Sequence, residues 1–292
     1  MSGSTVTAVV AKLPASKVKE LSMMLSTDEN KDKNIMLVEG PDDRKFYARF
    51  ISEVHVTFNV LNSCCYMPAI LALVNKDTTL CDRVIGIKDA DFDHIIGKTY
   101  GLNNLFLSDT HDWETMALTN ECERNVAIEA LGHNEVGIFD KVMRDLTNYS
   151  YLKLHNQEEI CEKGLDGINF RNFAIHRIYD GDTACDVEVC LREIKNHNNN
   201  ARLVHFPDKK DIDTIRKKYP TPDLLQFTCG HDIIHGVVRR LTYLKGSSPE
   251  IGDKEIARQL RTSFSIELFK KTRLYSEVLA WAVSKKTVVW AA

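Results

Sequence analysis

Carboxylates stand at the ends of two short apolar stretches of this chain. Ile35–Val38 is followed at once by Glu39, and Val84–Ile87 is followed by Lys88 and then by Asp89 and Asp91. An apolar run that ends abruptly in acids is typical of a buried strand whose C-terminal end delivers them to a sheet edge. Mg²⁺ prefers oxygen ligands and usually takes one or two carboxylates from the protein. The two stretches therefore predict a site for one or two Mg²⁺ or Mn²⁺ ions.

The roles of the individual residues follow from strand geometry. Asp89 and Asp91, two residues apart on one strand, would point the same way and could ligate one metal or bridge two. Glu39 is either a further ligand or the group that handles a proton during attack on phosphorus, and both roles stay open. Lys88 either lowers the pKa of the acids or contacts phosphate, although strand alternation points it away from the aspartates. Clustered carboxylates raise one another's pKa, so an ordered site requires the metal.

The order and spacing of these acids resemble the TOPRIM fold, the metal-dependent phosphodiester module of topoisomerases, bacterial primases and OLD-type nucleases. Val38–Asp43 and Asp89–Asp91 resemble its two signature motifs. Asn104–Ser108 and Asp112–Glu114 resemble the next strand and the acidic helix start of the OLD-like branch. The resemblance implies an open, mostly parallel α/β sheet flanked by helices, with catalytic Glu39, Asp89 and Asp91 at its edge.

The resemblance also adds two metal ligands, Asp43 and Glu114, to this set. Asp43 lies one turn into the helix after the first strand, for which Asp42 is the expected N-cap. The alternative role for Asp43 is stabilisation of the helix N-terminus, worth about 0.3–1 kcal/mol. Glu114 would serve a second metal position, since OLD-like nucleases resemble enzymes in which two metals clamp both oxygens of the displacement.

Histidines near the acids are candidates for substrate contacts. His94 and His111 lie in loops, where such residues are more often surface polar groups. Gly230–Asp232 resembles a Gly-Lys-Asp turn of related TOPRIM-like proteins, with His231 at the position of the lysine.

One further constellation suggests zinc. Cys229, His231 and His235 offer zinc-binding side chains, and histidines four residues apart share a helix face. A fourth ligand is missing from the local sequence, so this group does not reach the four-ligand pattern of structural zinc sites.

Composition and charge bound the function further. The chain has 292 residues, 43% of them hydrophobic and 27% charged, which is ordinary for a globular protein and excludes a disordered chain. No apolar run reaches the roughly 20 residues that span a bilayer, and no signal-peptide pattern begins the chain, so we expect a cytoplasmic protein without membrane contact. Residues 201–292 hold 17 Lys and Arg against 10 Asp and Glu. This basic part is either a phosphate-binding surface or a set of solvated helix faces.

Hydrophobic periodicity, read with the resemblance, divides the chain into four expected segments. They are an N-terminal arm or helix (1–33), a core that the resemblance identifies as TOPRIM-like (34–120), a mainly helical insertion with a few strands (121–230) and a C-terminal helical region (231–292). Strands are expected at 35–38, 54–60, 84–87 and 105–107, with helices between them, which implies a parallel sheet. Further strand-like runs are 203–206 and 224–230, while 172–179 is open between strand and helix. Residues 266–283 are expected to be helical throughout.

These features predict a Mg²⁺-dependent endonuclease acting on DNA or RNA, including tRNA. The chain lacks a Walker A sequence, whereas complete OLD-type enzymes carry an ABC-type ATPase in the same chain. It therefore resembles the stand-alone effector subunits of two-component anti-phage systems, including the PARIS type, which implies a toxic effector controlled by an ABC-type ATPase partner or by homo-oligomer formation. The alternative is a TOPRIM-like sensor that holds Mg²⁺ and a phosphorylated ligand without cleavage. A primase or topoisomerase is disfavoured, because neither a zinc ribbon nor a nucleophilic tyrosine context is found.

Overall fold

The computed structural model describes residues 3–62, 66–163, 167–198 and 206–291, which divide into two compact units. The first unit comprises residues 1–89, 99–109 and 265–292, and the second comprises residues 90–98 and 110–264. The chain thus leaves the first unit directly after Asp89. This division differs from the four expected segments, because the last residues of the chain belong to the unit that contains the strands.

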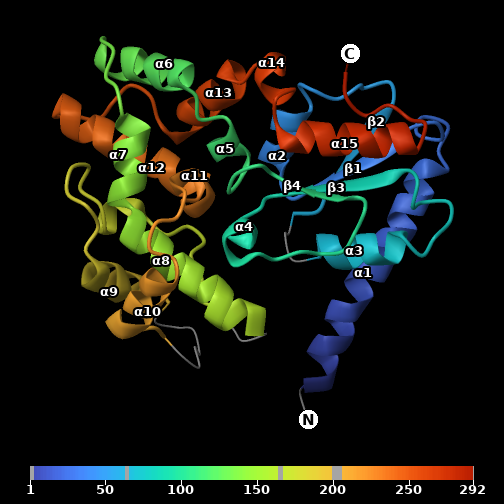
Figure 1. The fold of residues 1–292 in the computed structure, drawn as a ribbon, viewed down its shortest axis with the longest axis horizontal. Helices are drawn as coiled ribbons and strands as arrows, with labels where there is room; N and C mark the ends of the chain where they lie inside the picture. The colour runs from blue at the N-terminus through green and yellow to red at the C-terminus, as the bar shows by residue number, and fades with distance from the viewer. Residues whose placement is uncertain (1–2, 63–65, 164–166, 199–205, 292) are drawn as a thin grey trace. The chain divides into compact units, whose positions relative to one another are not determined.

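The first unit is built on a four-stranded, all-parallel sheet (Figure 1). Its strands are β1 (Asn34–Val38), β2 (Val56–Val60), β3 (Val84–Lys88) and β4 (Leu105–Leu107), in the spatial order β2-β1-β3-β4. Parallel neighbours need crossover connections, which the intervening helices provide. The expected α/β class with a parallel sheet flanked by helices is therefore confirmed.

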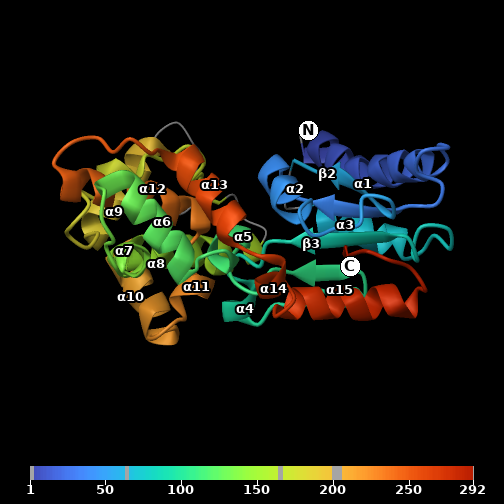
Figure 2. The ribbon, with the colours of Figure 1, turned by 90° about the horizontal axis from the view of Figure 1, so that it is seen from above.

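Helices cover both faces of this sheet. They are α1 (Gly3–Leu25), α2 (Pro41–Tyr47), α3 (Met67–Val74), α14 (Ile266–Phe269) and α15 (Arg273–Ser284). Figure 1 shows α15 on one side of the strands and α1 with α3 on the other, and Figure 2 shows the same layers from above. Both faces of β1 and β3 are consequently buried, which explains their continuous apolar runs.

The core of the first unit follows the alternation of β1. Ile35 and Leu37 are fully buried in a cluster with Leu21 and Leu71, contributed by α1 and α3. On the other face an aromatic cluster joins α2 to the C-terminal residues of the chain. Phe50 stacks on Phe269 with a centroid separation of 4.3 Å, and the cluster also contains Phe46, Tyr275 and Trp290.

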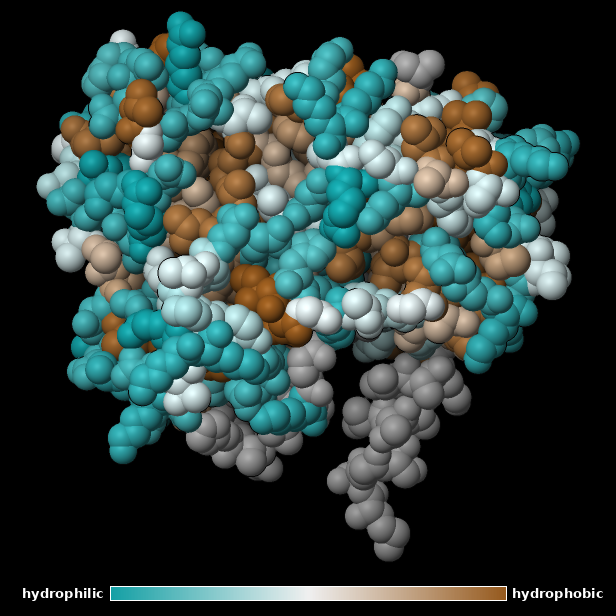
Figure 3. All heavy atoms as spheres, in the orientation of Figure 1, coloured by the Kyte–Doolittle hydropathy of each residue, from teal (hydrophilic) through white to brown (hydrophobic). Residues whose placement is uncertain are grey.

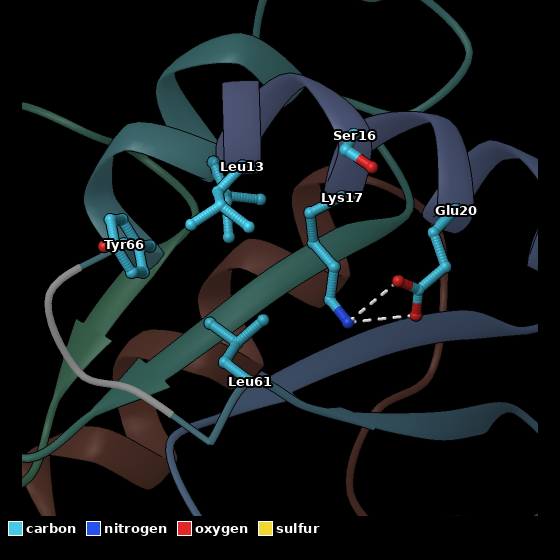
Figure 4. A pocket seen from close by; sticks show the side chains of 7 residues that line it. Leu13, Ser16, Lys17, Glu20, Leu61 and Tyr66 are labelled. Carbon is cyan, nitrogen blue, oxygen red and sulfur yellow. Dashed lines mark hydrogen bonds and ion pairs between the residues drawn. The ribbon is translucent and has the colours of Figure 1, made fainter. Parts of the chain in front are cut away.

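The helix α1 lies against α3 and leaves a small pocket between them (Figure 4). Its volume is about 220 Å³. Lys17 pairs with Glu20 at 2.9 Å inside it, and the amide of Asn59 donates to Glu20 at the same distance. The two charged side chains of the pocket thus pair with each other.

The second unit is helical. Its elements are α4 (Asp93–Ile96), α5 (Trp113–Met116), α6 (Asn120–Leu131), α7 (Ile138–Asp145), α8 (Thr147–His155), a π-helical turn (Asn156–Ile160), 3₁₀ turns at Cys161–Lys163 and Ile175–Arg177, α9 (Val187–His197), α10 (Lys209–Lys218), α11 (Leu224–Phe227), α12 (Gly230–Lys245) and α13 (Asp253–Ser263). The described residues contain no helix with the length and apolar composition needed to cross a membrane. Figure 3 accordingly shows a face that is largely hydrophilic, with hydrophobic residues in small groups.

Several expected elements differ from those observed. Residues 224–227 form helix α11 rather than a strand, because Asp223 caps it by accepting the N–H of Leu225 at 3.0 Å. The helix expected over 266–283 is interrupted at 270–272, since Thr272 caps the start of α15. The open segment 172–179 contains one 3₁₀ turn. The strand-like run 203–206 lies almost wholly outside the described residues.

Packing in the first unit predicts the effect of core truncation. We expect Leu37→Ala to lower the free energy of unfolding by about 2–5 kcal/mol, because Leu37 is fully buried and its loss leaves a cavity. Urea unfolding followed by circular dichroism measures this change. The matched control is Leu279→Ala on α15, whose side chain is 42% exposed and should cost about 0.5 kcal/mol or less. Equal losses in the two variants would contradict the described core.

Candidate metal centre

The predicted acids Glu39 and Asp89 lie at the same edge of the sheet. The strands β1 and β3 are parallel neighbours, with Leu37 opposite Gly86. Glu39 directly follows β1 and Asp89 directly follows β3. Parallel register therefore brings both carboxylate-bearing residues to the C-terminal edge, although they are far apart in the sequence.

The strand ends before the aspartate pair, which corrects the expected geometry of Asp89 and Asp91. The last residue of β3 is Lys88, and Asp91 has a φ of 49°, in the left-handed region that few residues other than glycine adopt. Its N–H donates to the carbonyl oxygen of His111 at 2.8 Å, within the second unit. Strand alternation therefore does not orient the pair. Chain connectivity alone keeps their Cα atoms within about 7 Å of each other.

Lys88 is buried at the end of β3, with 5% of its surface exposed. Its Nζ donates to the carbonyl oxygen of Asp89 at 2.6 Å. The side chain thus holds the backbone of the residue that carries the predicted ligand. This contact was not among the expected roles of Lys88.

Asp43 has a defined structural contact at the start of α2. Its Oδ2 accepts the backbone N–H of Gly40 at 2.7 Å, and the side chain is buried. The N-cap of α2 is Gly40, with Pro41 at the first helical position, so the expectation that Asp42 caps this helix was wrong. The alternative expected role of Asp43, stabilisation of the helix start, is therefore present, while its role as a ligand stays a prediction.

Glu114 lies in a tightly packed junction of the second unit. It belongs to α5, which Asp112 caps by accepting the N–H of Thr115 at 2.9 Å. The start of α12 packs directly on this turn, because a Cβ at Gly230 would lie 2.3 Å from Cβ of Glu114 and 2.5 Å from Oδ1 of Asp112. Only glycine fits at this position of the predicted Gly-His-Asp turn.

The carboxylate of Glu114 pairs with His231. The two groups are 2.8 Å apart, with Glu114 buried and the His231 side chain 68% exposed. Burial, together with the charge of Asp112, raises the pKa of Glu114 to about 7. The hydrogen bond and charge of Glu114 in turn raise the pKa of His231 to about 10. His231 therefore carries a positive charge at neutral pH, as a lysine at this position would.

The other predicted substrate-contacting histidines differ in environment. His94 is half-buried in the short helix α4. His111 is 3% exposed, and its ring lies 4.9 Å from that of Phe92. His111 is thus an interior residue rather than a surface polar group.

The predicted zinc constellation of Cys229, His231 and His235 is not assembled. His231 is held by Glu114, and His235 pairs with Asp253 at 3.0 Å. Within the described residues, Cys229 lies instead with His111 and Asp112, and the ligand atoms of these three residues are all within 4.8 Å of one another. Burial raises the pKa of the Cys229 thiol to about 12. Sequence reasoning missed this grouping, because no local spacing links Cys229 to residues so far upstream.

Ion pairs engage Lys209, Arg216 and Lys218 of α10. Arg216 pairs with Asp213 at 2.9 Å and also donates to Asn148, while Lys218 pairs with Glu158. Lys209 lies 3.5 Å from Asp213. These contacts favour a structural role for α10 over a dedicated phosphate-binding surface.

No model of a known protein family matches this chain, and a search of curated proteins finds no similar sequence. The resemblance to TOPRIM proteins consequently depends on the acidic motifs alone. The parallel sheet and the shared edge of Glu39 and Asp89 are compatible with it.

Two substitutions of Asp43 distinguish its role at the start of α2 from a role as a metal ligand. Asparagine can still accept the Gly40 N–H, so Asp43→Asn should keep most of the stability, whereas Asp43→Ala should lose about 1 kcal/mol. Thermal unfolding measures both. If Asp43 is also a metal ligand, Asp43→Asn should weaken Mg²⁺ binding in isothermal titration calorimetry. Unchanged Mg²⁺ affinity in a stable Asp43→Asn protein would restrict Asp43 to the helix start.

The Glu114–His231 pair predicts a pH dependence of stability. Both groups have a higher pKa in the folded chain than their ordinary values of 4.5 and 6.5, so the folded chain binds their protons more tightly than the unfolded chain does. Their contribution is complete at low pH and is lost as the pH rises through about 7 for Glu114 and about 10 for His231. Glu114→Gln removes the titration of Glu114 and the largest cause of the raised pKa of His231. Its free energy of unfolding should fall less than that of the wild type between pH 5 and 10, by on the order of 2–3 kcal/mol once solvent screening of the exposed His231 side chain reduces its share.

Urea unfolding in buffers across this pH range makes the comparison. Glu129→Gln on α6 is the matched control, because Glu129 is exposed and should leave the pH dependence of the wild type unchanged. If the free energy of unfolding had the same pH dependence in the wild type and in Glu114→Gln, the pair would not bind these protons more tightly in the folded chain.

Proposed function

We propose that the protein is a Mg²⁺-dependent nuclease of the TOPRIM type that hydrolyses phosphodiester bonds of nucleic acid. The observation that carries this proposal is the position of Glu39 and Asp89, directly after two adjacent parallel strands at one edge of the sheet. In open α/β sheets this edge is where ligands usually bind.

The donor chemistry of the edge suits a hard divalent cation. Glu39 and Asp89 offer carboxylate oxygens, and Asp91 follows within two residues. Bound Mg²⁺ would polarise the phosphoryl oxygens and lower the pKa of an attacking water. Lys88 fixes the backbone of Asp89 by its hydrogen bond. Glu39 would hold the metal or take the proton of the attacking water.

The biological role in this proposal comes from the resemblance to stand-alone TOPRIM effectors of anti-phage systems. In this role the protein would be a toxic nuclease that an ABC-type ATPase partner restrains until infection, and its substrate would be DNA or RNA, including tRNA. The finer assignment to the OLD-like branch depends on Asp112–Glu114 and on the Gly230–Asp232 turn.

Nuclease activity and its dependence on Glu39 provide the test. Purified protein with Mg²⁺ or Mn²⁺ should cleave plasmid DNA, single-stranded DNA or tRNA, and EDTA should abolish cleavage. Glu39→Gln and Asp89→Asn should each lower the rate by at least about 100-fold, because a group that handles the reacting proton is worth that much and a lost ligand weakens the metal site. Gel electrophoresis of the products measures the rates.

The matched control is Glu53→Gln, an exposed glutamate of the same unit, which should cleave at the wild-type rate. Cells expressing the wild type should grow poorly, and Glu39→Gln should relieve this toxicity. Protein that binds Mg²⁺ yet stays inert, both alone and with any ABC-type ATPase found to be encoded beside it, would favour the non-cleaving sensor over the nuclease.

A further inference from the structure

Three side chains with different donor atoms meet inside the second unit. The imidazole of His111, the carboxylate of Asp112 and the thiol of Cys229 place their ligand atoms within 4.8 Å of one another. His111 and Asp112 are buried, with 3% and 6% of their surfaces exposed. None of the three belongs to the acidic set proposed to hold Mg²⁺.

The backbone around the three residues is fixed by hydrogen bonds. The N–H of His111 donates to the carbonyl oxygen of Leu225 at 2.9 Å, which ties it to α11. The N–H of Gly230 donates to Oδ2 of Asp112 at 2.6 Å, which ties the start of α12 to the cap of α5. Cys229 lies between these two attachments, directly before Gly230, and is therefore held beside Asp112. Such outer contacts orient metal ligands in known sites.

The donor atoms retain the capacity to bind a metal. Each oxygen of Asp112 accepts one backbone N–H, from Thr115 and from Gly230, and a carboxylate oxygen has a second lone pair. One ring nitrogen of His111 belongs to this group, and its Nδ1 is buried with no hydrogen-bond partner among the described residues. Buried polar atoms normally have a partner, so the imidazole retains donor capacity for a bound ion.

We infer that His111, Asp112 and Cys229 form a binding site for a transition metal ion, with Zn²⁺ as the expected occupant. Imidazole and thiolate are the donors that Zn²⁺ prefers, and a carboxylate is a common third ligand. Mg²⁺ takes oxygen ligands and would not select a site containing a thiolate. Three protein ligands leave one position of a tetrahedral ion for water or another donor.

The site shares no ligand with the proposed nuclease centre, although Asp112 caps the helix that carries Glu114, and it differs from the zinc constellation suggested by local sequence. Its cysteine is the one that the sequence singled out, but its partners come from the turn before α5 rather than from α12. Binding of Zn²⁺ or Co²⁺ can be measured without any substrate. Failure of the nuclease proposal would therefore leave this inference intact. Conversely, a protein without zinc could still be a Mg²⁺-dependent nuclease.

Metal content and Co²⁺ spectroscopy of the full chain test the inference. Wild-type protein purified in the presence of Zn²⁺ and then desalted should hold about one zinc ion per chain in elemental analysis. Co²⁺ added to protein stripped of zinc should give a thiolate-to-cobalt charge-transfer band, which excess Zn²⁺ removes and excess Mg²⁺ does not. Cys229→Ser should abolish the band, and His111→Gln should weaken Co²⁺ binding by more than the roughly 10- to 100-fold seen for outer-shell partners.

Cys81→Ser is the matched control, because Cys81 lies in the first unit and should leave the zinc content and the band unchanged. Since His111 is buried and its variant could unfold, circular dichroism accompanies each measurement, and Cys229→Ser changes one atom only. A folded wild type that binds neither Zn²⁺ nor Co²⁺ would overturn the inference. The same holds if Cys229→Ser and Cys81→Ser retain equal bands.

Discussion

The parallel pairing of β1 and β3 is the constraint on which the first unit depends. With Leu37 opposite Gly86, the two strands end together, and whatever follows them meets at one edge. Gly86 also lets α3 lie close against the sheet, because a Cβ there would come within 2.7 Å of side-chain atoms of Met67 and Leu71. The helices on both faces of the sheet are therefore needed to hold the strands that carry the acidic residues, because parallel sheets are normally covered on both faces.

Three of the acidic residues predicted for the metal centre each have a separate local contact. Asp43 accepts a backbone N–H, Glu114 has a histidine partner, and the backbone of Asp89 is held by Lys88. A cluster of bare carboxylates would raise the pKa of its members and resist folding. Local partners of this kind allow the chain to fold before a cation binds, and a cation that used Asp43 or Glu114 would compete with those partners.

The strands of the sheet could be predicted from the sequence because they have recognisable residue patterns. Ile35–Val38 and Val84–Ile87 are apolar on both faces and end in acids, so strand type and edge could both be predicted. The short run 224–230 carried no such signal, since apolar runs of this length fit helix and strand equally, and the cap at Asp223 decided the outcome. The grouping of His111 with Cys229 depends on tertiary packing, which no sequence spacing encodes.

The Gly230–Asp232 turn shows how one short segment can combine three separate contacts. Gly230 permits close approach to α5, His231 pairs with Glu114, and Asp232 pairs with Lys153 at 2.6 Å. Although burial disfavours the ammonium, Asp232 holds the pKa of Lys153 well above its usual range. The ammonium of Lys153 also lies 5.7 Å from the centre of the Tyr149 ring.

Two cations thus meet at this turn, an exposed one on His231 and a partly buried one on Lys153 of α8. These cations have different functions in the fold. Lys153 neutralises the partly buried carboxylate of Asp232 and links α8 to α12, which is a structural role. His231 is exposed and neutralises the predicted metal ligand Glu114 from the solvent side. Of these two cations only His231 is exposed. It is therefore the one that can rearrange when Glu114 binds another group.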